Sequence, residues 1–180
     1  MSKRATYRHG NVREAATEAG FRILDETGLE ALTMRNVADS IGVAHRSLYL
    51  AFNDREGLLD AIAVQAFDAM HAAVKSAKSG SDFAARYCRF ALGRSGLYDV
   101  MMSRRHGQMK HNPELQASVH RVITKAFEFF ATPGASSPVN RRAVMRMTML
   151  LHGAITLYRM GVLDIESDRI FLDEVRRMVG

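Results

Sequence analysis

Gly28 to Leu59 reads GLEALTMRNVADSIGVAHRSLYLAFNDREGLL, and this stretch decides the fold. Thr33 is a residue type that begins helices well, and apolar residues recur after it at helical spacing until Gly42, which ends the helix. A second short helix then carries Leu48 and Phe52 four residues apart, so that both face inward. Two short helices joined by a tight glycine-containing turn are typical of the helix-turn-helix, whose second helix enters the major groove of DNA.

The second short helix, residues 45–52, leaves His45, Arg46, Ser47 and Tyr49 on its outer face. An arginine can form two hydrogen bonds to guanine, and hydroxyl groups and helix N-termini bind phosphate oxygens. These side chains are therefore candidates for DNA contacts. An ordinary helical hairpin with a polar outer face fits the same pattern, and the spacing alone leaves that alternative open.

The rest of the chain also predicts helices, because it has only three prolines and no stretch that alternates β-branched and polar residues. We expect an all-α fold in which a helical bundle follows the N-terminal three-helix domain. The helix at about 138–161 is apolar around most of its circumference, so its own domain or a second subunit must cover it. The helices outside the helix-turn-helix are expected at about residues 11–27, 54–78, 82–94, 95–104, 113–131, 138–161 and 168–179.

Composition and charge indicate which kinds of partner the protein can have. The formal net charge of +6 suits an anionic partner. Lys3, Arg4, Arg8 and Arg13 precede the first acidic residue and form a basic arm that fits along phosphates, although a solvated tail fits the same residues. No long uncharged apolar run and no secretion signal occur, so we expect a cytoplasmic protein with no membrane partner. The lone Cys88 is expected to be a buried thiol.

The N-terminal segment resembles the TetR family of transcriptional regulators. The resemblance rests on Gly28, on Leu32 to Ala38, on Ile41 to Phe52 and on Asn53 to Leu59, and it extends to the opening Tyr7 to Arg13. It covers about 50 residues without gaps and implies a DNA-binding domain at 8–55, with its motif at about 33–52, and a dimerisation and effector domain at 56–180. Leu92 to Met102 and Leu151 to Ile155 resemble the effector domains that carry a tryptophan-histidine-glycine signature, with Leu151 in place of the tryptophan.

The resemblance assigns residues to the DNA contact. Thr33 and Tyr49 would bind phosphates, as would Arg55, which stands where the family usually has lysine. His45, Arg46 and Ser47 would face base edges or the backbone. Ala44 replaces the usual Ser or Thr cap, which costs the recognition helix roughly 1 kcal/mol, and Ala51 and Asn53-Asp54 are further departures. The predicted DNA-binding residues are Thr33, Arg35, His45, Arg46, Ser47, Tyr49 and Arg55.

The family also implies a function. We expect a ligand-responsive repressor that binds a palindromic operator in double-stranded DNA as a homodimer, joined through residues 138–161 and 168–179. Apolar pockets with a few polar groups suit small molecules, and aromatic and methionine residues of the second domain, Phe83 and Tyr87 among them, are candidates to line one. From these we predict an effector pocket lined by Phe90, Tyr98, Met102, Phe127, Met149 and His152.

Other chemistry finds little support in the sequence. His106, His111, His120 and His152 have separations that match no compact set of metal ligands, so no metal and no cofactor are expected. No nucleophile elbow, phosphate-binding loop or metalloprotease motif occurs, which argues against an enzyme. Two alternatives to the regulator are an all-helical protein-protein interaction module without specific DNA binding and a helical enzyme that retains a vestigial DNA domain.

Overall fold

The computed structural model describes residues 9–180, with the backbone alone for residues 9–11, 106 and 108. Lys3, Arg4 and Arg8 of the predicted arm therefore lie outside the described residues, as do Tyr7 and the start of the predicted DNA-binding domain. Across residues 9–180 every regular element is a helix, which confirms the all-α prediction.

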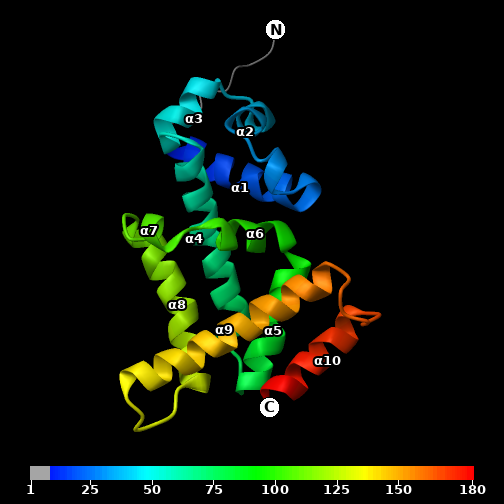
Figure 1. Ribbon diagram of the computed structural model, residues 1–180. Coiled ribbons are helices and arrows are strands. Elements are labelled where there is room, and N and C mark those ends of the chain that lie inside the picture. The colour runs from blue at the N-terminus through cyan, green and yellow to red at the C-terminus, as the bar shows by residue number, and fades with distance from the viewer. Residues whose placement is uncertain (1–8) are drawn as a thin grey trace.

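The N-terminal domain lies at one end of the molecule (Figure 1). It consists of α1 (His9–Thr27), the 3-10 helix η1 (Leu29–Ala31), α2 (Met34–Ile41) and α3 (His45–Phe52). Apolar side chains from each α-helix meet in its core, and burying them stabilises the domain at about 25 cal/mol per Å² of apolar surface. The core side chains Ala16, Ala19, Leu32, Val37, Leu48 and Phe52 are at most 3% exposed.

Local capping sets the ends of these helices, as the sequence predicts. The hydroxyl of Thr33 accepts a hydrogen bond of 3.1 Å from the amide of Asn36 and begins α2. Gly42 ends α2 with φ of 69°, a left-handed conformation that glycine adopts without steric cost. The carboxylate of Asp54 accepts a hydrogen bond of 2.8 Å from the amide of Gly57 and begins the next helix.

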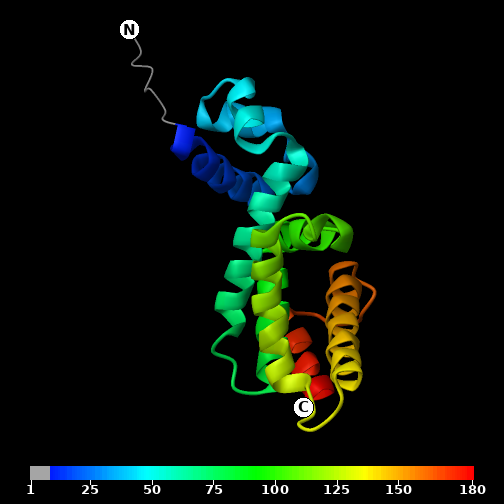
Figure 2. The same cartoon turned by 90° about the vertical axis from the view of Figure 1, so that its left-hand side faces the viewer.

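The C-terminal domain is a bundle of long helices below the N-terminal domain in Figure 1, and α4 runs from one domain into the other. Figure 2 shows α4 and α9 on opposite sides of this bundle, with α5 and α8 between them. The helices are α4 (Arg55–Val74), α5 (Gly80–Gly93), α6 (Ser95–Ser103), α7 (His106–Met109), α8 (Pro113–Phe130), α9 (Ser137–Arg159) and α10 (Asp168–Val179).

Two features of this domain differ from the prediction. Helix α4 ends at Val74 rather than near Lys78. Gly80, which lies between the predicted helices 54–78 and 82–94, is the first residue of α5, because the Ser79 hydroxyl accepts a hydrogen bond of 3.1 Å from the amide of Asp82. The four-residue α7 was not predicted, because one turn is too short to show a helical period.

Helix α4 supplies the core of the bundle. Its length and hydropathy would also suit a membrane span, and it is the one described helix of which this is true. Its apolar side chains are used within the fold, however, since Leu58, Leu59, Ile62, Met70 and Val74 are at most 1% exposed. Packing of this helix in the protein core therefore explains its composition.

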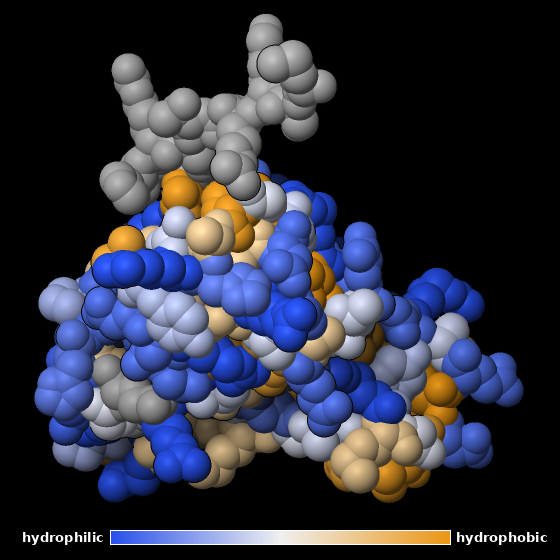
Figure 3. Space-filling model, turned by 90° about the horizontal axis from the view of Figure 1, so that it is seen from above, coloured by the Kyte–Doolittle hydropathy of each residue, from blue (hydrophilic) through white to orange (hydrophobic). Residues whose placement is uncertain are grey.

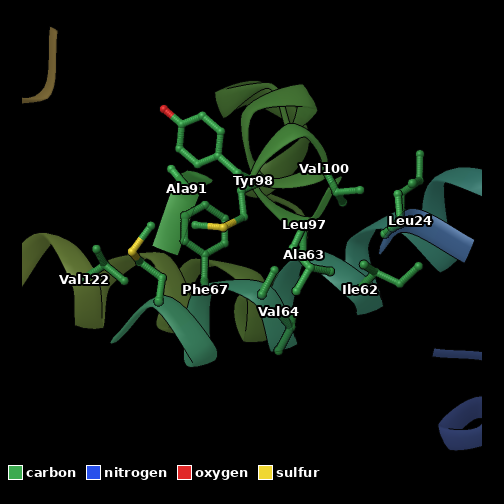
Figure 4. Close-up of a cluster of buried hydrophobic side chains, with 14 of the residues drawn as sticks. Leu24, Ile62, Ala63, Val64, Phe67, Ala91, Leu97, Tyr98, Val100 and Val122 are labelled. Atoms are coloured by element: carbon green, nitrogen blue, oxygen red, sulfur yellow. The ribbon is translucent and has the colours of Figure 1, made fainter. Parts of the chain in front are cut away.

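Helix α6 joins the two domains. A Cβ atom added at Gly96 would lie 2.5 Å from the carbonyl oxygen of Leu24 in α1, so only glycine allows this approach. Figure 4 shows Leu24 beside Ile62 of α4, near Leu97 and Val100 of α6. The buried guanidinium of Arg104, just after α6, pairs with Glu56 at 2.8 Å and with Asp60 at 3.2 Å, both on α4. Side chains at and near α6 thus contact both α1 and the first turns of α4.

Helix α9 is covered on one side only. Of its 23 residues, Val144, Leu151 and Ile155 are buried. Its other faces expose large apolar side chains. The helical period of the sequence did not show whether these side chains pack in the core of the domain or against a second subunit. The exposed apolar side chains on α9 and its C-terminal end are Val139, Met145, Met149, Leu150, Leu157 and Met160.

Candidate nucleic-acid interface and effector cavity

Helices α2 and α3 form a tight helix-turn-helix. The amide of Val43 donates to the carbonyl of Ala38 at 3.1 Å, which closes the turn behind Gly42. Ala44 occupies the N-cap of α3 and supplies no side-chain hydrogen bond, as its methyl group predicts. Leu48 and Phe52 point into the domain and are at most 3% exposed. The opposite face of α3 is consequently free to meet another molecule.

The outer face of α3 combines polar and apolar side chains. His45, Arg46 and Tyr49 are exposed and Ser47 is half-buried. Within residues 9–180, neither the guanidinium of Arg46 nor the hydroxyl of Tyr49 has a hydrogen-bonding partner. Leu50, which is not among the predicted DNA-binding residues, is 67% exposed. Its position two residues after the inward Leu48 was the available signal, and an apolar side chain can contact the methyl group of thymine.

Asp39 connects α2 to the start of α3. Its carboxylate lies 3.2 Å from Nε2 of His45 and 3.8 Å from Nε of Arg35, and all three side chains are exposed. The contact orients the His45 ring so that Nδ1 remains available. Asp39 was not among the predicted site residues, because its contact with His45 crosses the turn between the two helices.

Arg55, predicted to bind phosphate, is held by the protein backbone. Its Nε donates to the carbonyl of Leu32 at 2.9 Å, and one Nη donates to that of Leu29 at 3.3 Å. These bonds tie the start of α4 to the segment before α2. The hydroxyl of Thr33 lies in that segment, beside the N-terminus of α2.

Arg13, placed in the basic arm by the sequence analysis, contacts the end of α3. Its Nη1 donates to the carbonyl of Ala51 at 3.0 Å, and its guanidinium lies 4.9 Å from the centre of the Phe52 ring. Such a cation-π contact is favourable by about 0.5–1 kcal/mol. Arg13 therefore holds the C-terminal end of α3 against α1. Viewed from the end that carries α1–α3, hydrophilic side chains cover most of the surface and hydrophobic ones form small groups (Figure 3).

The C-terminal domain contains an apolar cavity of about 170 Å³. Met102 and His152, both predicted, line it. Tyr98 lines a neighbouring hollow of about 510 Å³ that shares Met102 and His152 with the first. The predicted Phe90, Phe127 and Met149 line neither, and Met149 is 65% exposed. The cavity wall comes from Phe67 of α4, Phe83 and Tyr87 of α5, Met102 of α6, Val119, Val122, Ile123 and Ala126 of α8, and Val144, Met147, Thr148, Leu151 and His152 of α9.

Two tyrosines hydrogen-bond the imidazole of His152. The Tyr98 hydroxyl contacts Nδ1, and the Tyr87 hydroxyl lies 3.4 Å from Nε2. Burial lowers the pKa of His152 and raises the pKa of both tyrosines, so all three groups are uncharged at neutral pH. The cluster is therefore a neutral hydrogen-bonding end of an otherwise apolar cavity. Among the residues that the structure describes, no three His, Cys, Asp or Glu side chains lie close enough to hold a metal ion.

Two family models match the chain. Residues 16–62 match the model described as bacterial regulatory proteins, tetR family, and residues 80–178 match the tetracyclin repressor-like C-terminal domain. The first match includes the helix-turn-helix, and the second includes most of the helices that line the cavity.

Individual proteins are similar over nearly the whole chain. An uncharacterised HTH-type transcriptional regulator of Mycobacterium tuberculosis is 25% identical over 176 residues, which cover 93% of this chain and 80% of that protein. A solved structure of a protein of unknown function from Rhodococcus sp. RHA1 is 25% identical with a TM-score of 0.73, and the match covers 97% of this chain and 98% of that one. A TetR variant from Acinetobacter baumannii AYE in complex with minocycline has the same fold, at 19% identity and a TM-score of 0.61, over 97% of this chain and 95% of that one.

Proposed function

Because this chain belongs to the TetR family and is a DNA-binding transcriptional regulator, we propose that it binds a palindromic operator as a homodimer and releases it when a small molecule enters the C-terminal domain. The family also points to a regulator rather than to an enzyme. We place this activity in the cytoplasm, where operator DNA lies.

The observation that carries the operator proposal is the outer face of α3. Arg46 and Tyr49 are exposed and have no partner in residues 9–180, while Arg13 holds the other end of the helix in place. Arg46 would contact guanine, and Tyr49 with the Thr33 hydroxyl would contact phosphates. Two such helices about 34–36 Å apart would read two half-sites one turn of DNA apart.

The homodimer proposal rests on the exposed face of α9. Met145, Met149, Gly153 and Leu157 follow one another at four-residue spacing and form an exposed stripe along the helix. A Cβ at Gly153 would meet no atom within 4 Å, so the backbone is open to close approach there. A second copy of α9 would cover these apolar side chains, which a monomer leaves in water.

Ligand release rests on the position of α6 between the cavity and the DNA-binding domain. Met102 of α6 lines the cavity, and Gly96 of the same helix contacts α1. A molecule that enters the cavity would displace α6 and with it α1 and the first turns of α4. It would release the operator only if it binds the displaced conformation more tightly than the DNA-bound one. A TetR variant of the same fold holds minocycline, which supports a ligand-binding role for this domain.

Selection of genomic DNA fragments by the purified protein at physiological salt tests the operator proposal. We expect the enriched fragments to share a palindrome. Arg46→Ala should weaken binding to it by about 1–3 kcal/mol, roughly 5- to 150-fold, because one base-reading side chain is lost. Lys75→Ala is the control, since it removes one positive charge from an exposed position after α4, outside both α3 and the stripe of α9. Equal loss in the two variants would show that Arg46 contributes charge alone.

Light scattering during size-exclusion chromatography tests the dimer. Met149→Glu places a charge on the exposed stripe of α9 and should give a monomer. Leu50→Glu makes the same kind of change at a similarly exposed position, 67% against 65%, on α3. It should remain a dimer and lose operator binding. A Met149→Glu protein that stays dimeric at micromolar concentration would contradict the proposed interface.

A further inference from the structure

The cavity of the C-terminal domain has a chemical character that limits what it can bind. The described residues that line it include no Asp, Glu, Lys or Arg. Burying a charge without a partner is costly, so a charged molecule would find no compensation there. The neighbouring hollow does contain Asp99 and Arg159, but these two pair with each other at 2.6 Å. The cavity therefore suits an uncharged molecule.

The polar groups of the cavity lie at one end. Thr148 uses its hydroxyl to donate to the carbonyl of Val144 at 3.0 Å, and both nitrogens of His152 face tyrosine hydroxyls, so the Tyr87 hydroxyl is the donor left to meet a ligand. The contact of 3.4 Å between Tyr87 and His152 is longer than a strong hydrogen bond, so the Tyr87 hydroxyl is weakly held and can pair with a ligand oxygen instead.

A ligand hydroxyl group can pair with the Tyr87 hydroxyl in either tautomer of the neutral His152 imidazole. If the neutral ring donates from Nε2, the Tyr87 hydroxyl keeps its own hydrogen for a ligand oxygen. If Nε2 accepts from Tyr87, the Tyr87 oxygen can still accept from a ligand O–H. A ligand hydroxyl both donates and accepts, so it satisfies both arrangements.

The volume and the wall of the cavity limit the size and the chemistry of the rest of the ligand. Its volume is about 170 Å³, and an apolar protein cavity of roughly 150 Å³ is known to take up benzene. The rings of Phe67, Phe83 and Tyr87 contribute to its wall, and aromatic rings favour edge and offset contacts with one another. Met102 and Met147 can adapt to the outline of a guest.

We propose that the effector is an uncharged molecule with one aromatic ring and one hydroxyl group, that is, a simple phenol. Its ring lies among the phenylalanines and its hydroxyl hydrogen-bonds the hydroxyl of Tyr87, beside His152. The assignment rests on the proposed ligand response of the C-terminal domain and specifies the chemistry of that response.

Binding is tested on the full-length protein with three small probes: phenol, toluene and benzoate. Calorimetry should give the tightest binding for phenol, weaker binding for toluene, which lacks the hydroxyl, and none for benzoate, which is charged. Spectra of isotope-labelled methionine methyl groups locate the guest. Met147 lines only the cavity and Met160 only the neighbouring hollow, so phenol should shift Met147 and leave Met160 in place.

A pair of variants tests the hydroxyl contact. Tyr87→Phe should reduce phenol affinity about tenfold and leave toluene affinity unchanged, since only the hydrogen bond is lost. Tyr158→Phe is the matched control, because this tyrosine lies on α9, the helix of His152, but donates to Asp168, outside the cavity. The assignment fails if phenol does not bind, if benzoate binds as well as phenol, or if Tyr87→Phe changes the two affinities equally.

An operator-release assay separates this inference from the proposed function. Phenol that shifts Met147 but leaves the operator bound would support the cavity chemistry and overturn control of DNA by this ligand. Release of the operator by a larger or charged molecule, with no phenol binding, would overturn the ligand class and leave the ligand-responsive repressor intact.

Discussion

Replacing Gly96 by alanine should push α6 away from α1 and so weaken the contact between the two domains. The added Cβ would lie 2.5 Å from the carbonyl oxygen of Leu24 and 2.9 Å from its carbonyl carbon, whereas ordinary contact begins at 3.4 Å. Both atoms belong to the backbone of α1, which cannot rotate away as a side chain can, so α1 and α6 must move apart by about 1 Å. Overpacking of this kind costs about 1–3 kcal/mol, offset by at most about 1 kcal/mol from the better helix propensity of alanine. We expect a net loss of about 1–2 kcal/mol in the free energy of unfolding.

Urea unfolding followed by circular dichroism measures this loss. Both variants are compared at one protein concentration, because the stability of the proposed dimer would depend on concentration. Gly93→Ala is the matched control, since a Cβ there would meet no atom within 4 Å. It should leave the stability unchanged or raise it by up to about 1 kcal/mol. Gly96→Ala should also bind the operator more weakly, because the N-terminal domain is displaced. If the two variants unfold at the same urea concentration, the close approach of α6 to α1 is refuted.

Three further predictions concern single side chains. Thr33→Ala removes the cap of α2 and should lower the free energy of unfolding by about 1 kcal/mol, whereas Thr33→Ser should retain it; equal losses would contradict capping. Burial raises the pKa of the Cys88 thiol to about 12, so a thiol reagent at neutral pH should label the protein only in urea, and rapid labelling of the native protein would disprove this burial. Burial also lowers the pKa of His152 from its ordinary 6.5, so the unfolded chain takes up a proton at higher pH than the folded one and stability should fall as the pH drops through 6.5, levelling off below the folded pKa. His152→Gln should reduce this dependence, as measured by urea midpoints at about pH 7.5 and 5.5, and an unchanged dependence would place its origin elsewhere.

The fold could be predicted because its signals are local. A helical period needs only neighbouring residues, and the caps at Thr33 and Asp54 act within three residues of chain. The departures were local as well, because α7 is too short to show a period and Ser79 turned an expected break into a helix start. The DNA contacts assigned to α3 remain predictions that the proposed binding experiments test.

The lining of the cavity is a matter of tertiary packing. Phe90, Phe127 and Met149 line neither the cavity nor the neighbouring hollow, yet they have the same apolar character as Phe83 and Val144, which line the cavity. An apolar side chain on a helix can face the core, a cavity or a second subunit, and these three environments favour the same residue types. Only the packing of five helices around one space distinguishes them.

The sequence by itself determined the helix-turn-helix, since spacing, capping and turn chemistry all act between residues close in the chain. Tertiary structure decided what the charged and polar side chains do. Arg13 reaches a carbonyl 38 residues away, Arg55 reaches carbonyls 23 and 26 residues before it, and Tyr98 meets His152 across 54 residues. Long side chains find such partners only after the helices have packed, because no local pattern states which backbone groups and rings will lie within their reach.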